Sequence, residues 1–396
     1  IGDLMPINSL LYPSNVFVPT TFDVDNSVRM DGSSKFTRSF GSAGNRKKWT
    51  MSMWVKRGAL SADQKLMGKY TSSSDRFALL FNGSDQLQIF WGNSGGNKQI
   101  TTNRLFRDTS AFYNFTFIID TGNSTESDRM QIWVNGVRET SMASTAYPTS
   151  GQDLPWNDSG VNEIGSYNNG NKFNGYLAEV VFQNDNAATP VDKFISFDED
   201  SGICVPIDVS GLTLGTNGFY LDFEDSSALG NDASGSNNFT SAGLAAIDQS
   251  TDIPINNFAT MNPLDNFYAE STFSEGNLNL VMADSPNTWN TSTIGVSSGK
   301  WYFEVKELAE GASGSSQVGV ADRPTVAADE ELGGIATTFA YTSNGRFRTG
   351  GSQTAADKAT WGVNDVIGIA LDMDASPATV TFTKNGSAAG STQNLT

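Results

Sequence analysis

Two pairs of carboxylates have a spacing that could support chemistry. Asp222 precedes Glu224 in YLDFED, and Asp372 precedes Asp374 in LDMD. Side chains two residues apart on a strand share a face, and glycoside hydrolysis needs two carboxylates about 5 to 10 Å apart across the sugar. Solvent-facing or turn-capping carboxylates are the alternative, which we prefer. We therefore expect no catalytic residues and no enzyme.

Other kinds of catalysis are limited by the residues that the chain lacks. Its 396 residues include no histidine and a single cysteine, Cys204. A Ser-His-Asp triad, a Cys-His pair and a His-ligated metal site are therefore excluded, as is an intramolecular disulfide. We expect Cys204 to serve as a small buried hydrophobic residue.

Three loops combine an aromatic ring with amide side chains, as sugar-binding sites do. The ring stacks on the sugar, and the amides hydrogen-bond its hydroxyls. Each ring could equally fill the edge of a core, and this alternative stays open. The candidate glycan or ligand residues are Trp91 and Asn93 in FWGNSGGNK, Trp156 and Asn157 in LPWNDSG, and Tyr167, Asn168 and Asn169 in GSYNNGN.

Two acid-rich loops, 120–128 and 197–202, are candidates for binding Ca²⁺ through their carboxylates. Neither has the regular spacing of a dedicated calcium loop, and solvated loops are the alternative. The sequence therefore leaves the metal undetermined and predicts no other cofactor.

The charge of the chain limits its partners. The formal net charge of −18 opposes long-range attraction to nucleic acid or to anionic lipid. No run of about 18 apolar residues is present to cross a bilayer, and the first 17 residues lack the layout of a signal peptide. We expect neither nucleic-acid binding nor membrane insertion.

Alternating apolar residues predict strands rather than helices. In WTMSMWVKRG at 49–58, apolar residues at odd positions alternate with polar ones, except that Trp54 adds a ring on the other face. That second face must then be covered as well. Asn-Gly pairs at 82–83, 135–136 and 385–386 predict hairpins with tight turns. Further strands are expected within 76–92, 112–121, 128–140, 175–184, 218–223, 276–283, 300–308, 316–323, 364–374 and 378–386.

The first half resembles the laminin-G-like, concanavalin A-type lectin domains of phage and bacterial surface proteins. The matching pieces are DNSVRMDGSSKFTRSFGSAGNRKKWTMSMWVKRG at 25–58, QIWVNGVRE at 131–139 and EIGSYNNGNKFNGYLAEVVFQN at 163–184. Family members often carry Trp-His-His before the hairpin, where this chain has AFYNFTFIID. The Glu-x-Asp-x-x-Glu pattern of the related hydrolases is missing, because Gln131 ends its nearest equivalent.

The second half resembles a SPRY domain through GKWYFEVKEL at 299–308, QVGVADR at 317–323 and WGVNDVIGIALDMD followed by ATVTFTKNG at 361–386. The resemblance implies further strands after Thr396. The two resemblances together imply an all-β chain of two concanavalin A-like antiparallel β-sandwich (jelly-roll) domains in tandem. We place a laminin-G-like domain at 1–205, a connector with one strand at 206–265, and a SPRY-like domain at 266–396.

A laminin-G-like module followed by a SPRY-like one resembles virion proteins of marine bacteriophages. This resemblance implies a non-enzymatic tail fibre or spike on the virion surface that binds a host-surface glycan or protein through sandwich-end loops. Its further partners would be other virion proteins, and fibres and spikes usually form homotrimers. One alternative is a capsid-decorating, head-fibre or structural virion protein without a host ligand. A carboxylate-based polysaccharide hydrolase is the less favoured alternative.

Overall fold

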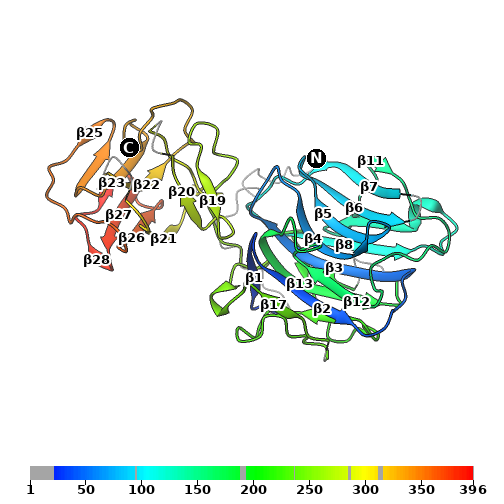
Figure 1. Cartoon of the computed structure of the whole chain (residues 1–396). Coiled ribbons are helices and arrows are strands. Elements are labelled where there is room, and N and C mark those ends of the chain that lie inside the picture. The colour runs from blue at the N-terminus through cyan, green and yellow to red at the C-terminus, as the bar shows by residue number, and fades with distance from the viewer. Residues whose placement is uncertain are drawn as a thin grey trace, which may run out of the picture. The chain divides into compact units, whose positions relative to one another are not determined.

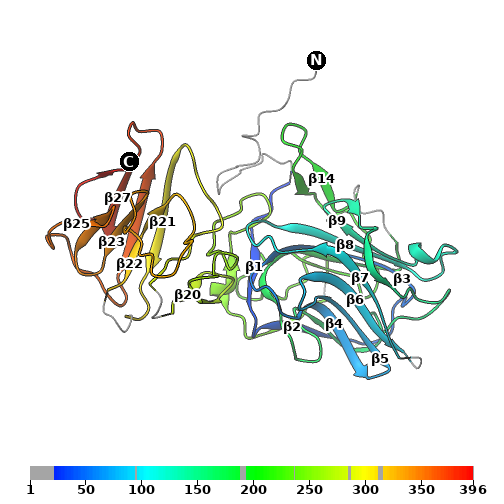
Figure 2. The ribbon, with the colours of Figure 1, turned by 90° about the horizontal axis from the view of Figure 1, so that it is seen from above.

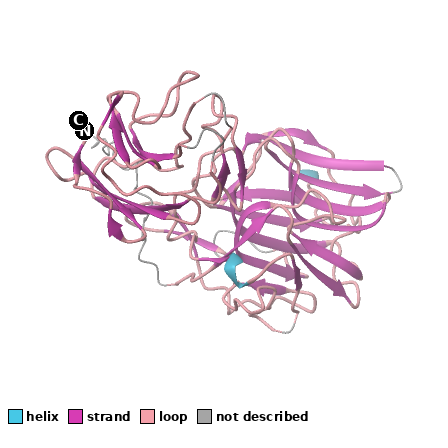
Figure 3. Cartoon of the chain, turned by 60° about the vertical axis from the view of Figure 1, so that its left-hand side comes forward, coloured by secondary structure: helices cyan, strands magenta, loops and turns pink. Residues whose placement is uncertain are grey.

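The chain is built almost entirely from strands, turns and loops. The computed structural model describes residues 22–93, 96–187, 193–235, 237–283, 287–310 and 315–395. Its helices in these ranges are the short 3-10 helices Glu126–Asp128 (η2) and Ala246–Asp248 (η3), drawn in cyan in Figure 3. No helix within the described residues is long and apolar enough to cross a membrane. The prediction of an all-β fold is confirmed.

The described residues form two compact units. The larger unit holds residues 22–260 and 273–279, and the smaller unit holds 261–272 and 280–395. The predicted connector 206–265 contributes its expected strand, Phe219–Leu221 (β16), and two that the sequence did not predict, Thr240–Ala242 (β17) and Gln249–Ser250 (β18). The bounds 1–205, 206–265 and 266–396 stay predictions.

The larger unit stacks two eight-stranded antiparallel sheets, whose layers are visible in Figures 1 and 2. Sheet 1 runs β10 (Val137–Arg138), β9 (Met130–Val134), β8 (Tyr113–Asp120), β3 (Lys48–Arg57), β13 (Asn174–Asn184), β1 (Ser27–Asp31) and β18, with β16 also paired to β13. Sheet 2 runs β11 (Met142–Thr145), β7 (Gly96–Leu105), β6 (Gln86–Asn93), β5 (Asp75–Phe81), β4 (Gln64–Ser72), β12 (Gly160–Ile164), β2 (Lys35–Phe40) and β17. Two short hairpin sheets pair β14 (Ile195–Phe197) with β15 (Cys204–Pro206) and β19 (Thr272–Ser274) with β20 (Asn279–Val281).

Strand β3 shows why the two sheets stack. Its odd-numbered residues, including Trp49 and Met51, are fully buried in the core between the sheets. Each such side chain stabilises the fold by roughly 1.5–3 kcal/mol through burial. Trp54 points to the other face and is buried in a second cluster with Phe194 and Leu214, which confirms that this face is covered.

Cys204 packs against that second cluster and is half-buried rather than fully buried. Burial raises the pKa of its thiol to about 12. The thiol therefore stays protonated at neutral pH and is a poor nucleophile.

The three Asn-Gly hairpins differ in their turns. Asn135 and Gly136 have φ of 47° and 75°, and Asn385 and Gly386 have φ of 49° and 79°, as a tight turn on the Asn-Gly pair requires. At 82–83 the prediction is wrong in detail. The turn spans four residues, and the left-handed residue is Asp85, with φ of 64°.

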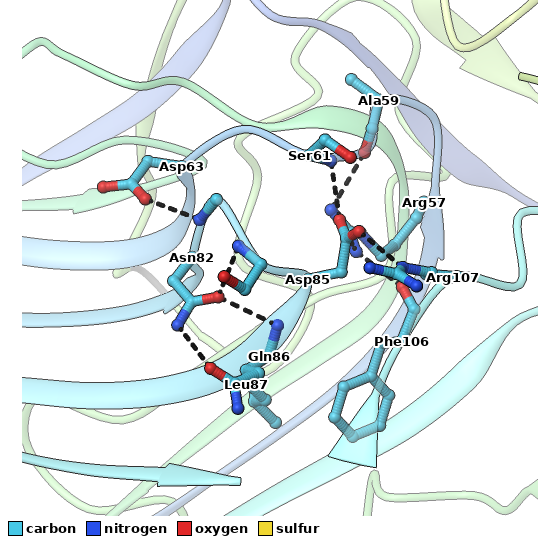
Figure 4. Close-up of polar contacts among 12 residues, drawn as sticks. Arg57, Ala59, Ser61, Asp63, Asn82, Asp85, Gln86, Leu87, Phe106 and Arg107 are labelled. Atoms are coloured by element: carbon cyan, nitrogen blue, oxygen red, sulfur yellow. Dashed lines mark hydrogen bonds and ion pairs between the residues drawn. The ribbon is translucent and has the colours of Figure 1, made fainter. Parts of the chain in front are cut away.

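Asp85 is held in this turn by a buried ion pair with Arg57, shown in Figure 4. Arg57 Nη1 donates to Asp85 Oδ1 at 3.0 Å and to the Phe106 carbonyl at 2.6 Å. The Ser61 amide donates to the same carboxylate at 2.7 Å, and Arg107 Nε donates to Oδ2 at 3.0 Å. Because Arg57 ends β3 and Asp85 lies between β5 and β6, the pair joins the two sheets.

The pKa of Asp85 reflects the same contacts. Burial alone would raise it, but the hydrogen bond from the Ser61 amide and the contacts with Arg107 and Arg57 hold the pKa below its usual value. These contacts therefore favour the ionised form of the carboxylate.

Strand β13 carries a second buried carboxyl group. Its register with β3 shifts between Ala178 and Val181, and Glu179 in this bulge has φ of 49°. The Tyr220 hydroxyl of β16 donates to Glu179 Oε2 at 2.6 Å. Burial raises the pKa of Glu179 to about 8, so this carboxyl is protonated in the folded protein at neutral pH.

The smaller unit also pairs two antiparallel sheets around a core that includes Tyr341, Ile369 and Phe382. One sheet runs β21 (Lys300–Lys306), β26 (Val366–Asp372), β27 (Thr379–Lys384) and β28 (Ser387–Ala388), with β29 (Gln393–Asn394) also beside β27. The other runs β22 (Gln317–Ala321), β23 (Thr338–Thr342), β24 (Arg346–Thr349) and β25 (Ser352–Gln353).

We predict that Asp85→Ala lowers the free energy of unfolding by about 3–5 kcal/mol, because it leaves Arg57 buried without its counter-ion. Urea titration followed by tryptophan fluorescence measures the change. Asp128→Ala is the matched control, since Asp128 and Arg138 form an ion pair with both side chains 30% exposed. The control should lose no more than about 1 kcal/mol. Equal losses in the two variants would contradict the role given to the buried pair.

We also predict that Glu179→Gln changes how stability depends on pH. The unfolded pKa is near 4.5 and the folded pKa is about 8, so the wild type loses stability as the pH rises between these values. The amide cannot ionise and does not incur this loss. The melting temperature of the variant relative to wild type should therefore rise from pH 5 to pH 9, whereas Glu126→Gln, at an exposed position, should show no such trend. If the melting-temperature difference between Glu179→Gln and wild type stays constant with pH, the raised pKa of Glu179 is refuted.

Candidate ligand-binding face

On the outer face of sheet 2, two small residues lie side by side. The strand register pairs Glu163 of β12 with Gly68 of β4, Gly68 with Ala78 of β5, and Ala78 with Phe90 of β6. Residues directly opposite in a sheet share a face. The core-facing neighbours Phe77 and Leu79 show that this row points outward.

Tyr167 packs over Gly68 on this face. A Cβ added at Gly68 would lie 2.7 Å from Tyr167 Cβ, so only glycine allows the ring to approach the sheet this closely. Backbone hydrogen bonds fix the loop that carries Tyr167, from Gly165 N to the Leu66 carbonyl and from Lys65 N to the Asn171 carbonyl, both at 2.8 Å.

Three rings meet there, and we call Tyr70, Phe90 and Tyr167 the aromatic patch. Tyr167 makes edge-to-face contacts with Tyr70 and Phe90, at centroid distances of 5.8 and 6.3 Å. Tyr70 is 41% exposed, and Phe90 and Tyr167 are half-buried. The patch therefore offers aromatic surface to solvent on a rigid sheet.

A cation and an amide border the aromatic patch. The register pairs Tyr70 with Arg76, Arg76 with Gly92 and Gly92 with Asn97. The Arg76 guanidinium lies 5.0 Å from the Phe90 ring centroid and donates to Asn97 Oδ1 at 2.6 Å. Burial raises the pKa of Tyr167, and the positive charge of Arg76 partly offsets this rise.

The amides of the Tyr167 loop lie at the surface. Asn168 and Asn169 are exposed and have φ of 50° and 58°. The backbone amide of Asn169 donates to Glu163 Oε2 at 3.3 Å, and Lys35 Nζ donates to Glu163 Oε1 at 2.7 Å. The loop therefore presents two exposed side-chain amides next to the aromatic patch.

The predicted aromatic residues Trp91 and Trp156 are core residues, which is the alternative that the sequence left open. Both are fully buried. Trp91 follows Phe90 on β6 and faces the opposite side of the sheet, and Trp156 makes an edge-to-face contact with Phe182 at 5.8 Å. Neither ring can stack on a ligand. Asn93 ends β6, and its side chain lies outside the described part of the chain.

Asn157 is a buried structural residue rather than a ligand contact. It is fully buried with φ of 68°. Its Nδ2 donates to the Asn45 carbonyl at 3.0 Å and to Asn184 Oδ1 at 2.6 Å, and its Oδ1 accepts from Asn217 Nδ2 at 2.9 Å. Asn157 therefore ties three segments together, and its buried side chain is not accessible to a sugar.

Three of the four paired carboxylates have partners within the fold. Asp372 Oδ2 lies 2.9 Å from Lys300 Nζ, and Asp374 accepts from the Gly299 amide at 2.7 Å. Asp222 Oδ1 accepts from the backbone amide of Glu224 at 3.2 Å. Within the described ranges, no three Asp, Glu or Cys side chains gather in a way that could hold a metal ion.

Sequence reasoning missed Tyr70, Phe90 and Arg76. The signal for Phe90 was present, because Leu87, Ile89 and Trp91 alternate as one face and leave Phe90 on the other. Tyr70 and Arg76 could not be identified, since they meet only through the pairing of β4 with β5.

Comparisons with known proteins agree with this architecture. Residues 31–190 match the family model of the concanavalin A-like lectin/glucanases superfamily, and residues 300–394 match the SPRY domain. The chain thus carries a concanavalin A-like domain and a SPRY domain, as the resemblances implied. No curated protein matches the chain.

Several solved structures are similar to the chain. A heptameric SAP-like pentraxin from Limulus polyphemus is 16% identical over 43% of this chain and 80% of its own, with a TM-score of 0.32. Domain 4 of the arabinanase AbnA from Geobacillus stearothermophilus, in complex with arabinotriose, is 17% identical over 41% and 72%, with a TM-score of 0.33. A candidate carbohydrate binding protein from Bacteroides ovatus is 16% identical with a TM-score of 0.37, over 56% of this chain and only 59% of its own.

Proposed function

We propose that the chain is a non-catalytic binding protein whose larger unit holds a glycan on the aromatic patch. The observation that carries this proposal is the edge-to-face cluster of Tyr70, Phe90 and Tyr167 on an outer sheet face, beside Arg76. Sugar rings have apolar C–H faces that pack on aromatic rings. The match of residues 31–190 to a superfamily that includes lectins supports the proposal.

The polar groups around the patch would give the site its selectivity. Arg76 and Asn97 lie along one row of the sheet, and the exposed amides of Asn168 and Asn169 lie on the Tyr167 loop. Guanidinium and amide groups offer several donors and acceptors in fixed directions, which suits sugar hydroxyls and carboxylates. This differs from the predicted sandwich-end loops, since the ring surface lies on the sheet itself.

We predict that Tyr70→Ala weakens binding to the best ligand of a glycan array about tenfold, through loss of one stacking surface. Isothermal titration calorimetry with that ligand measures the loss. Tyr70→Phe should restore most of the affinity because the ring is retained. Phe267→Ala removes an aromatic side chain that is 83% exposed in the smaller unit and should leave the affinity unchanged. Unaltered binding by Tyr70→Ala would move the site elsewhere.

We further propose that the chain is displayed on a phage virion, as a tail fibre or spike that contacts the host. The pairing of a laminin-G-like with a SPRY-like module supports this proposal through its resemblance to marine phage proteins. Several copies on one particle, with homotrimers as the expected form and other virion proteins as neighbours, would strengthen a weak glycan contact through effective concentration.

The location of the chain on the particle tests this second proposal. Gold-labelled antibody against the chain should mark the tail tip in electron micrographs, and deleting its gene should reduce adsorption to host cells. Label on the capsid lattice with normal adsorption would favour the capsid-decorating alternative. Release of reducing ends from a host polysaccharide, abolished in a variant lacking Asp222 and Glu224, would favour the hydrolase instead.

A further inference from the structure

The smaller unit contains a polar pocket with a volume of about 120 Å³. It lies among four parts of the chain: the residues after β21, the residue before β22, the turn between β23 and β24, and the segment that precedes β26. The residues that line it are Glu307, Glu310, Ser316, Ser343, Asn344 and Trp361.

Backbone hydrogen bonds hold the walls of the pocket in place. Ser343 N donates to the Ser316 carbonyl at 2.9 Å, Trp361 N donates to the Ser343 carbonyl at 3.0 Å, and Glu307 N donates to the Asp365 carbonyl at 3.2 Å. The pocket is therefore a fixed feature of the sandwich.

Two buried groups in this pocket lack partners. Glu307 is 8% exposed; its Oε1 accepts from the Ser316 hydroxyl, but Oε2 has no hydrogen-bond partner among the described residues. Trp361 is 6% exposed, and its indole Nε1–H likewise has none in the described ranges. An unsatisfied buried carboxylate oxygen and an unsatisfied buried donor are each costly in a folded protein.

The charge of the lining points to the kind of ligand that would satisfy these groups. The residues that line the pocket include two glutamates and no lysine or arginine. The Glu310 carboxylate lies against the Gly362 backbone, since a Cβ added there would be 3.3 Å from Glu310 Oε1. Two carboxylates in a lining that holds no basic side chain favour a cation as the ligand.

An organic cation fits this pocket better than a metal ion does. Calcium takes six to eight oxygen ligands, usually several of them carboxylates. No group of three acidic or cysteine side chains suited to a metal is found within the described residues. A guanidinium presents five donors in a planar fork, which matches acceptors spread over two carboxylates and an amide.

We propose that this pocket binds the guanidinium group of an arginine in a partner protein. Glu307 and Glu310 accept hydrogen bonds from the guanidinium, and the Trp361 indole N–H donates to a peptide carbonyl of the same partner. Both unsatisfied groups then have partners. This site lies in a different unit from the aromatic patch and does not depend on glycan binding.

The indole N–H of Trp361 allows a direct test in the full chain. The chain carries eight tryptophans, so ¹⁵N-tryptophan labelling gives eight indole signals, and Trp361→Phe identifies the relevant one. The signals are followed during titration with N-acetyl-arginine-N-methylamide in the millimolar range. The matched probe is N-acetyl-citrulline-N-methylamide, which has nearly the same shape without the charge.

We expect the arginine probe to shift the Trp361 signal saturably and the citrulline probe to shift it at least tenfold more weakly. Glu307→Gln should weaken the arginine response about tenfold. Glu304→Gln, on the exposed part of β21, should leave the response unchanged. Methylguanidinium carries the cation without a peptide carbonyl. Because the proposal gives the Trp361 indole a carbonyl partner, N-acetyl-arginine-N-methylamide should bind more tightly than methylguanidinium.

Equal responses to arginine and citrulline, or an arginine response that Glu307→Gln leaves intact, would overturn the proposal. The other seven indole signals report whether Glu307→Gln remains folded. If it does not, Glu310→Gln takes its place, because Glu310 is exposed and its loss leaves the core intact. An unchanged arginine response in Glu310→Gln would then also overturn the proposal.

Discussion

The ion pair between Arg57 and Asp85 fixes how the two sheets of the larger unit meet at one end. The side chains of Arg57 and Asp85 are 0% and 1% exposed. The Arg57 guanidinium also lies 4.2 Å from the centroid of the Phe81 ring. The pair sets the turn between β5 and β6, and with it the register of the hairpin. A slip of one residue would exchange the two faces of β6. Phe90 would then enter the core and Trp91 would face solvent, so the aromatic patch depends on this pair.

The aromatic patch depends equally on a residue that has no side chain. Gly68 and Ala78 lie opposite each other in one row of the sheet, and the missing side chain of Gly68 leaves the space in which Tyr167 lies. A larger residue at Gly68 would lift the ring from the sheet and separate it from Tyr70 and Phe90. The exposed surface is therefore produced by backbone packing underneath it. Packing against the sheet therefore fixes where the Tyr167 ring lies.

Most of the strands could be predicted from the sequence, because alternation of apolar residues is a local property that the sheet reproduces. Both faces of β3 were predicted correctly for this reason. The loop residues were harder. Trp156 and Asn157 lie in a polar loop, yet residues distant in sequence, such as Phe182 and Asn184, bury both. The turn at Asn82-Gly83 likewise differs from its local preference, since distant Arg57 holds Asp85 in place. Of the predicted ligand residues whose side chains the structure describes, Tyr167, Asn168 and Asn169 are the ones that lie at the surface and adjoin the aromatic patch.

Three buried carboxyl groups of this chain differ in how their oxygens are satisfied. Asp85 keeps its charge and is surrounded by two arginines and a backbone amide. Glu179 gives up its charge, because burial raises its pKa to about 8 and the Tyr220 hydroxyl supplies a hydrogen bond. Glu307 is satisfied only in part: one oxygen accepts a hydrogen bond from Ser316, and the other has no partner in the described part of the chain. Asp85 and Glu179 both have partners for their buried oxygens, so the unpartnered oxygen of Glu307 favours a ligand from outside the chain. An arginine of a partner protein would satisfy Glu307 as Arg57 and Arg107 satisfy Asp85.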